Sequence, residues 1–242
     1  MVDELTPIAI YMANEMNANA HGPDCLRMAQ LNAVDSTACI TEYFSLPWWR
    51  RLFGGLSPQY CTDIAVSSQE AALMMWTRNV MQNAKWDHKP FIRSLFPSHS
   101  THAGVWHRYD KTDYFYDIWS NIHYGYLGTA AGFERKHDIV MGTLRGFPNP
   151  PAMSGAGQSP SPLDASADGA GLEQIGTDVL RGRMPQSTPG VTGLRAFDDA
   201  SDRTSISMGI EFYSLVPSHL SPKELVATIL MTAGLDTRSA GP

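Results

Sequence analysis

The sequence has little of what marks membrane-spanning or nucleic-acid-binding proteins. It contains no long apolar run, so no segment is predicted to span a membrane. Its 18 Lys and Arg residues are outnumbered by 24 Asp and Glu residues, which gives a formal net charge of −6. Nucleic-acid binding usually requires a basic face, because neutralised phosphates supply most of the affinity. A nucleic-acid partner is therefore less expected than other ligands, and only a local basic cleft would accommodate one.

Cysteine is also scarce, and no secretory leader is evident. Cys25, Cys39 and Cys61 lack the CxxC spacing of a zinc knuckle, and an odd number of cysteines does not indicate a closed disulfide framework. One bridge with one free thiol and three free thiols are both compatible with the sequence. Asp3 and Glu4 stand where a secretory signal carries basic residues, so we expect another export route if the protein leaves the cell.

What is present is the composition of a folded protein. Hydrophobic residues make up 43% of the 242 residues and charged residues 17%, which is typical of globular chains. The length favours one domain over residues 1–242, alone or with a small lobe. We expect its core to run from about residue 7 to 213, followed by a C-terminal helix and a dispensable tail.

The periodicity of the apolar residues predicts an α+β fold. Before residue 145 the spacing is mostly helical, with helices expected from Thr6 to about His21 and from a capping box at Ser67 to about Ala84. Clean alternation occurs only from Ile206 to Phe212, which predicts a strand. We therefore expect a helical N-terminal half, a small antiparallel sheet toward the C-terminus and two long Pro/Gly/Ser-rich loops, at 146–171 and 184–193.

The densest group of reactive side chains lies in the segment 114–128. Asp117, Asn121 and Tyr124 fall on one face at helical spacing, and His123 lies at the edge of that face. We take Asp117, Asn121 and His123 as candidate catalytic residues. The candidate substrate-binding residues of this segment are Tyr116, Trp119, Tyr124 and Tyr126. The alternative is an aromatic core helix that Asp117 caps and that contains one satisfied histidine.

A second polar cluster precedes Pro90. Asp87, His88 and Lys89 place a carboxylate, an imidazole and a cation within one turn, which can orient a base or hold a phosphate. We add Asp87 and His88 to the catalytic candidates and Lys89 to the substrate-binding ones, although a solvated turn would have the same composition. His99 and His102 could share a metal, but no HExxH motif accompanies them.

A third cluster comes before the expected strand. Asp198, Asp199 and Asp202 with Arg203 form either a site for Mg²⁺ or Ca²⁺, which prefer carboxylate oxygens, or a turn that Arg203 satisfies. We expect the cluster to share the pocket of Asp117 and His123, since Arg203 could hold an anion there. The asparagines of the first helix, Asn14, Asn17 and Asn19, are expected to be solvated, with Glu15 the residue of interest beside them.

Aromatic and basic residues follow one another from Pro47 to Gly55, which includes Trp48, Trp49 and two arginines. This segment either fills the core under a loop or forms an exposed patch that meets a partner or a membrane interface.

The central segment also resembles a known family. The motif Tyr116-Asp117-Ile118-Trp119-Ser120-Asn121-Ile122-His123-Tyr124-Gly125-Tyr126 is similar to the signature of the bacterial polymorphic toxin type 44 domain. Weaker likenesses lie at Glu15–Asn19, at Trp86–Lys89 and from Phe197 to Ile210, so that the resemblance runs from about Pro7 to Tyr213. It implies an antibacterial effector with a secretion-system carrier and a cognate immunity protein.

A fainter resemblance suggests the reaction. Colicin M-like enzymes, which cleave the lipid-linked peptidoglycan precursor, carry an Asp-x-Tyr-Asp-x5-His-Arg motif. Tyr116, Asp117 and His123 keep this spacing, whereas Tyr114 replaces the first Asp and Tyr124 replaces the Arg. The resemblance implies a hydrolase that acts on an envelope substrate in the periplasm, reached without a secretory signal peptide.

Three functional hypotheses follow. In the envelope hydrolase, Asp117 and His123 handle protons while Arg203, or a metal on Asp199 and Asp202, stabilises negative charge. In an RNase-type nuclease toxin, His88 and His123 are the acid and base and Arg203 holds the phosphate. A non-catalytic binder or pore-former is disfavoured by the lack of a long amphipathic or apolar segment.

Overall fold

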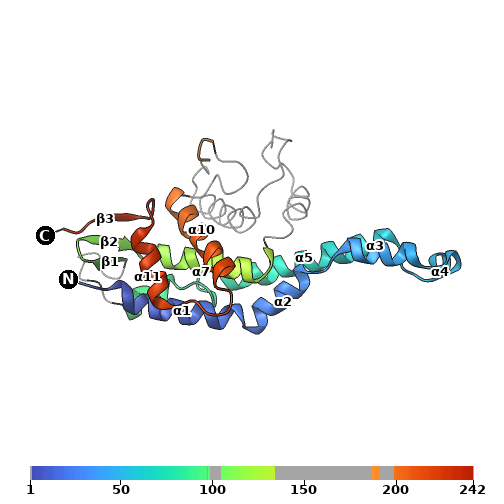
Figure 1. The fold of residues 1–242 in the computed structure, drawn as a ribbon, viewed down its shortest axis with the longest axis horizontal. Coiled ribbons are helices and arrows are strands. Elements are labelled where there is room, and N and C mark those ends of the chain that lie inside the picture. The colour runs from blue at the N-terminus through green and yellow to red at the C-terminus, as the bar shows by residue number, and fades with distance from the viewer. Residues whose placement is uncertain (1, 97, 99–104, 134–186, 191–198, 242) are drawn as a thin grey trace.

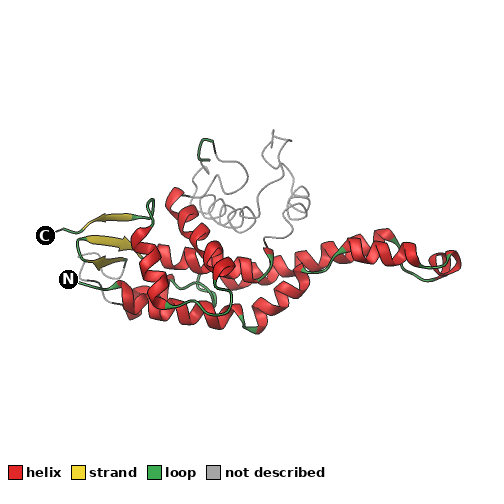
Figure 2. Cartoon of the chain, viewed as in Figure 1, coloured by secondary structure: helices red, strands yellow, loops and turns green. Residues whose placement is uncertain are grey.

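A computed structural model describes residues 2–96, 98, 105–133, 187–190 and 199–241 of the chain. Within these ranges helices predominate, and one three-stranded antiparallel sheet accompanies them (Figures 1 and 2). The predicted α+β class with a helical N-terminal half is confirmed. The two predicted Pro/Gly/Ser-rich loops lie outside the described residues, apart from 187–190.

The described residues 2–96 form six helices: α1 (Leu5–Ala20), α2 (Pro23–Asn32), α3 (Ser36–Ser45), α4 (Trp48–Phe53), α5 (Pro58–Val80) and α6 (Lys89–Leu95). The rest of the described chain contains β1 (Trp106–Tyr109), β2 (Thr112–Phe115), α7 (Asp117–Ala130), α10 (Ala200–Leu215), α11 (Pro222–Met231) and β3 (Thr237–Ser239). The core lies where α1, α7, α10 and α11 pack together.

Helix α5 begins earlier than its sequence predicts. The side chain of Ser57 accepts a hydrogen bond from the backbone N–H of Tyr60, and Pro58 occupies the first turn. Serine caps and proline at the first position are strong start signals. Ser67, the predicted cap, lies inside the helix and donates its hydroxyl to the carbonyl of Asp63. The capping-box prediction at Ser67 is therefore wrong.

The predicted strand at 206–212 is also wrong, because this segment is part of helix α10. Ile206 and Ile210 lie four residues apart and so share one helical face, while Met208 and Phe212 share another. All four side chains are buried, and Met208 and Phe212 belong to the main core. Two interleaved apolar faces of one helix thus produce an alternation that resembles the period of a strand.

Helices α7 and α10 cross in direct backbone contact. A Cβ atom on Gly125 would lie 2.0 Å from the carbonyl oxygen of Ile206, and one on Gly209 would lie 2.0 Å from that of Ile122. Only glycine permits this approach at both positions. Gly125 thus lets another backbone approach α7 closely, and α10 is the element that approaches.

The sheet joins distant parts of the chain. Strands β1 and β2 form a hairpin, and β3 pairs antiparallel with β2 so that Thr112 faces Ser239. The buried carboxylate of Asp113 on β2 binds Arg108 of β1 at 2.9 Å and Arg238 of β3 at 3.3 Å. The C-terminal tail, predicted from the sequence to be dispensable, supplies the third strand of this sheet.

Helices α3 and α4 and the first turns of α5 form an arm that extends away from the rest of the molecule (Figure 1). Cys39 of α3 and Cys61 of α5 form a disulfide in this arm, whereas Cys25 is a buried free thiol. The structure thus selects one bridge and one thiol from the two arrangements that the sequence permits. No helix in the described ranges is long and apolar enough to cross a bilayer.

Candidate active site

Two polar clusters that are distant in the sequence meet between the start of α6 and helix α7. The Nε2 atoms of His88 and His123 are 3.2 Å apart, and Lys89 Nζ lies 2.7 Å from Asp117 Oδ1. His88 and Lys89 are consecutive, so this one dipeptide contacts both reactive ends of the α7 motif. The structure therefore links the side chains of Asp117 and His123 indirectly, through the consecutive residues Lys89 and His88.

Side chains from α1 extend the histidine pair. The Tyr11 hydroxyl lies 3.0 Å from His88 Nδ1, and Asn19 Nδ2 lies 3.3 Å from His123 Nε2. Asn19 also donates to Glu15 Oε2 at 3.2 Å. Burial, and to a lesser degree the charge of Glu15, raises the pKa of Tyr11 to about 12, so its hydroxyl keeps its proton at neutral pH.

One placement of protons is compatible with the short contacts. In it, Tyr11 donates its hydroxyl proton to His88 Nδ1, and His88 Nε2–H points to His123 Nε2. The Asn19 amide shares the single lone pair of that His123 nitrogen with His88. The side chains thus form a continuous chain of donors and acceptors from Tyr11 to Glu15, which fixes both imidazole rings.

Both histidines are held in the neutral form. Burial lowers the pKa of His88 to about 4, although the charge of Asp87 opposes the shift. Burial, and then repulsion from His88, lowers the pKa of His123 well below its usual value. The exposed fractions of the two residues are only 1% and 2%. The pair can therefore orient neighbouring groups through hydrogen bonds, but it does not present a charged imidazolium at pH 7.

The Lys89–Asp117 ion pair and Tyr116 are partly exposed to solvent. The side chains of Lys89 and Asp117 are 38% and 19% exposed. Burial raises the pKa of Tyr116, with the charge of Asp117 adding to the shift and Lys89 and Arg93 opposing it, so all three charges lie within electrostatic range of the phenol. A cation, a carboxylate and a protonated hydroxyl thus meet at the rim of the buried histidine pair.

Asp87 supports the turn that carries the pair. Its carboxylate accepts from the backbone N–H of Asn83 at 2.8 Å and from that of Lys89 at 3.2 Å. Asp87 thereby fixes the backbone of the dipeptide His88-Lys89 and acts on the site through its position.

Carboxylates gather along the edge next to Asp117. Asn121 Nδ2 donates to Asp202 Oδ1 at 2.8 Å. Burial raises the pKa of Asp236, and the charges of Asp117 and Asp199 raise it further. In the described part of the chain no group of three His, Cys, Asp or Glu side chains has the arrangement of a metal site. The predicted Mg²⁺ or Ca²⁺ site at Asp199 and Asp202 therefore lacks a complete ligand set among these residues.

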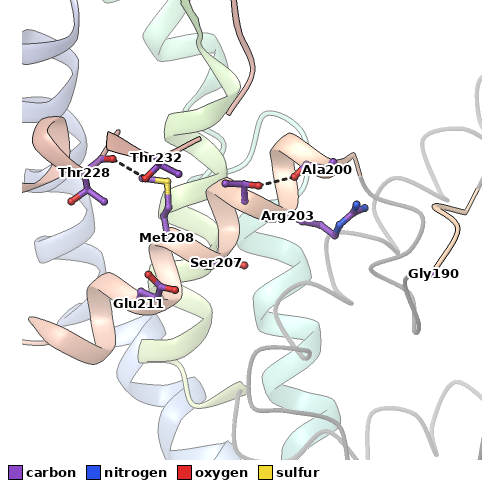
Figure 3. Close-up of a pocket in the computed structure, with 9 residues that line it drawn as sticks. Gly190, Ala200, Arg203, Ser207, Met208, Glu211, Thr228 and Thr232 are labelled. Carbon is purple, nitrogen blue, oxygen red and sulfur yellow. Dashed lines mark hydrogen bonds between the residues drawn. The ribbon is translucent and has the colours of Figure 1, made fainter. Parts of the chain in front are cut away.

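Arg203 lines a different pocket. Its Nη1 donates to Thr188 Oγ1 at 3.3 Å, and the side chain lines a pocket of about 630 Å³ together with Ser207 and Glu211. Figure 3 shows Arg203 extending from α10 toward Gly190. The lining residues of this pocket include none of the histidine pair, and Lys89 is the cation that stands beside Asp117.

The four aromatic residues predicted to bind substrate differ in their exposure to solvent. Trp119 and Tyr126 are fully buried in the core, so we no longer include them in a substrate surface. Tyr124 is partly buried and accepts a hydrogen bond from Trp76 Nε1 at 3.0 Å. Tyr116 alone contacts the charged rim. His99, His102 and Asp198 lie outside the described residues.

The sequence did not identify two members of the cluster, Tyr11 and Asn19. Both lie on α1 with the apolar stripe of that helix, where a hydroxyl or an amide is ordinarily solvated. Asn17 is also paired, since it exchanges two hydrogen bonds with the backbone of Leu220, at 2.9 and 2.8 Å. The signal that could have found Asn19 is its place in the Glu15–Asn19 segment of the resemblance.

The arrangement suits chemistry on a charged ester. A partly exposed lysine can stabilise negative charge on a phosphate oxygen, a carboxylate can accept a proton from water, and a protonated phenol can donate one. His88 is buried directly before Lys89 in the chain, and His123 is buried in the helix that Asp117 begins. The cluster thus contains the cation, the proton acceptor and the proton donor that these steps use.

Comparison with known proteins supports a toxin assignment. No curated protein and no solved structure gives a significant match to the chain. A family model matches residues 75–144, a segment that contains His88, Lys89, Asp117 and His123. That family is bacterial toxin 44, and the match indicates a bacterial toxin domain.

Proposed function

We propose that this chain is a hydrolytic antibacterial toxin that cleaves a phosphate ester or pyrophosphate in a lipid-linked envelope substrate. The observation that carries the proposal is the Lys89–Asp117 ion pair at the solvent edge of the buried His88–His123 pair. An anionic substrate competes for Lys89 and so releases the Asp117 carboxylate. The carboxylate then accepts a proton from the attacking water while Lys89 stabilises the phosphate. The Tyr116 hydroxyl can protonate the leaving oxygen.

Two further observations favour the envelope over the cytoplasm. A Cys39–Cys61 disulfide persists in oxidising compartments such as the periplasm and is rare in the cytosol. The charges of Asp117 and Asp199 both act on the carboxyl group of Asp236, so three acidic side chains lie near one another at the site. Their combined negative charge disfavours the binding of a long polyanion there. A short lipid-linked phosphate presents less negative charge to that edge than RNA does.

The test compares delivery to two compartments. Wild-type protein with an added secretory signal should lyse or round sensitive cells, and the same protein kept in the cytoplasm should not. Asp117→Asn should remove the toxicity while its melting temperature stays within a few degrees of wild type. Toxicity that requires cytoplasmic expression would contradict the proposal.

A nuclease remains the second candidate, because the contact between His88 and His123 brings together the two residues that it needs as acid and base. Incubation of purified protein with total RNA and plasmid DNA distinguishes the two functions. We expect both nucleic acids to stay intact. Degradation by wild type that is lost in His123→Ala would favour the nuclease.

A further inference from the structure

The end of the arm carries several exposed apolar side chains. We call this group the tip surface, and its members are Phe44, Trp48, Trp49, Leu52, Phe53 and Tyr60. Phe53 is 85% exposed and Trp48 is 67% exposed. Neither α3 nor α4 contains a buried residue. The Pro47–Gly55 segment is thus an exposed patch and does not fill the core.

The tip surface differs in charge from the rest of the protein. The sequence has no acidic residue between Glu42 and Asp63, and Arg50 and Arg51 lie within this interval. The Arg50 guanidinium lies 5.3 Å from the centroid of the Trp49 ring. A basic, aromatic tip on a chain of net charge −6 is complementary to an anionic surface.

The arm holds this surface away from the body of the molecule. The Cys39–Cys61 disulfide ties α3 to α5, with 22 residues of separation enclosing α4. Figure 1 shows α4 at one end of the molecule, with the sheet and both chain ends at the other. The described body therefore does not cover the tip, and the tip can meet a flat external surface before any other part does.

We propose that the tip surface binds the interfacial region of an anionic phospholipid bilayer. Tryptophan rings favour the boundary between headgroups and acyl chains, where the ring is buried and the indole N–H stays hydrated. Arginine side chains extend toward lipid phosphates while their methylene stems remain in apolar surroundings. Helix α4 has only six residues, so it lies at the interface and does not span the bilayer. This binding surface is separate from the Lys89–Asp117 cluster and does not depend on the proposed reaction.

The experiment measures co-sedimentation of the full chain with vesicles of phosphatidylcholine, with and without about one third phosphatidylglycerol. Wild type should bind the anionic vesicles at least about tenfold more strongly than the neutral ones, and added salt should weaken the binding. Trp48→Ser with Phe53→Ser should reduce binding to both vesicles. Arg50→Gln with Arg51→Gln should abolish the preference for the anionic lipid.

A matched control uses exposed apolar residues away from the tip. Leu215 and Met231 are 80% and 86% exposed, so Leu215→Ser with Met231→Ser removes similar surface and should leave binding unchanged. Equal helix content by circular dichroism shows that each variant is folded, as expected for substitutions of exposed side chains. Absence of vesicle binding by wild type, equal loss in the control variant, or concentration-dependent dimerisation through the tip without lipid binding would each overturn the proposal.

Discussion

At the scale of single residues, two lysine–aspartate pairs allow a direct comparison. Lys85 and Lys89 lie four residues apart, and each binds one aspartate, at 2.8 and 2.7 Å respectively. Lys85 pairs with Asp24 at an exposed position, whereas Lys89 pairs with Asp117 beside the histidines. Exposed pairs of this kind contribute at most about 1 kcal/mol to stability. A difference in toxicity between variants of the two lysines would therefore reflect the role of Lys89 in the reaction and not a difference in stability.

We expect Lys89→Ala to lower toxicity by about 100-fold or more, because it removes the cation that stabilises charge on the phosphate. Lys85→Ala should leave toxicity unchanged within about twofold, since it removes only a surface ion pair. Growth inhibition after periplasmic delivery measures both effects. Equal toxicity of the two variants would exclude Lys89 from the reaction.

The buried histidine pair predicts a pH-dependent stability. The folded-state pKa of His88 is about 4 and its ordinary value is 6.5, so the unfolded state binds a proton more readily. The unfolding free energy should therefore fall as pH drops through 6.5 and level off below about 4. His88 alone contributes a loss of roughly 2 kcal/mol between pH 7 and pH 5.

Urea unfolding at several pH values measures this loss, and His88→Asn should reduce the slope between pH 7 and pH 5. His123 acts in the same direction, so part of the slope should persist in that variant. An unchanged slope in His88→Asn would show that His88 is accessible to protons in the folded protein.

At the scale of elements, the crossing of α7 and α10 positions the site. α7 carries Asp117 and His123, and α10 fixes the rotation of α7 because Gly125 lies against the backbone of Ile206 and Gly209 lies against that of Ile122. Alanine would ordinarily stabilise a helix relative to glycine by about 1 kcal/mol. At these two positions its Cβ atom would overlap a carbonyl group of the other helix.

Gly125→Ala or Gly209→Ala should therefore lower the unfolding free energy by about 3 kcal/mol or more, since rigid backbone cannot move aside as a side chain can. Thermal denaturation followed by circular dichroism measures the change. Gly241→Ala provides the control, because a Cβ atom there meets no neighbouring atom. A neutral effect at Gly125 would mean that the helices are further apart than described.

At the scale of the whole molecule, the arm and the body are stabilised by different interactions. The body has a hydrophobic core, while the arm relies on the disulfide and on contacts between α3 and α5. Closing a loop of this length by a disulfide stabilises the folded state by about 3 kcal/mol. The loss of the bridge should therefore loosen the arm without unfolding the site.

We expect Cys39→Ser with Cys61→Ser to increase hydrogen exchange in α3 and α4 and to leave exchange in α7 unchanged. Mass spectrometry of the exchanged peptides resolves these segments. Cys25→Ser at the buried free thiol provides a comparison that keeps the disulfide. Increased exchange in α7 on loss of the bridge would show that arm and body unfold together.

The sequence by itself determined the α+β class, the helical N-terminal half and the likeness to a toxin family, because these depend on local periodicity and on short motifs. The packing of α7 against α10 could be seen only in the tertiary structure. The segment from Ile206 to Phe212 alternates like a strand in the sequence, but it is a helix whose two apolar faces are both buried. The same holds for the site. Asp117 and His123 were found from one segment of the sequence. The contacts that join them to other helices were not: His88 pairs with His123, Lys89 pairs with Asp117, and Asn19 contacts Glu15 and His123. Contacts between residues far apart in the chain leave no periodic trace in the sequence, so only the folded chain decides them.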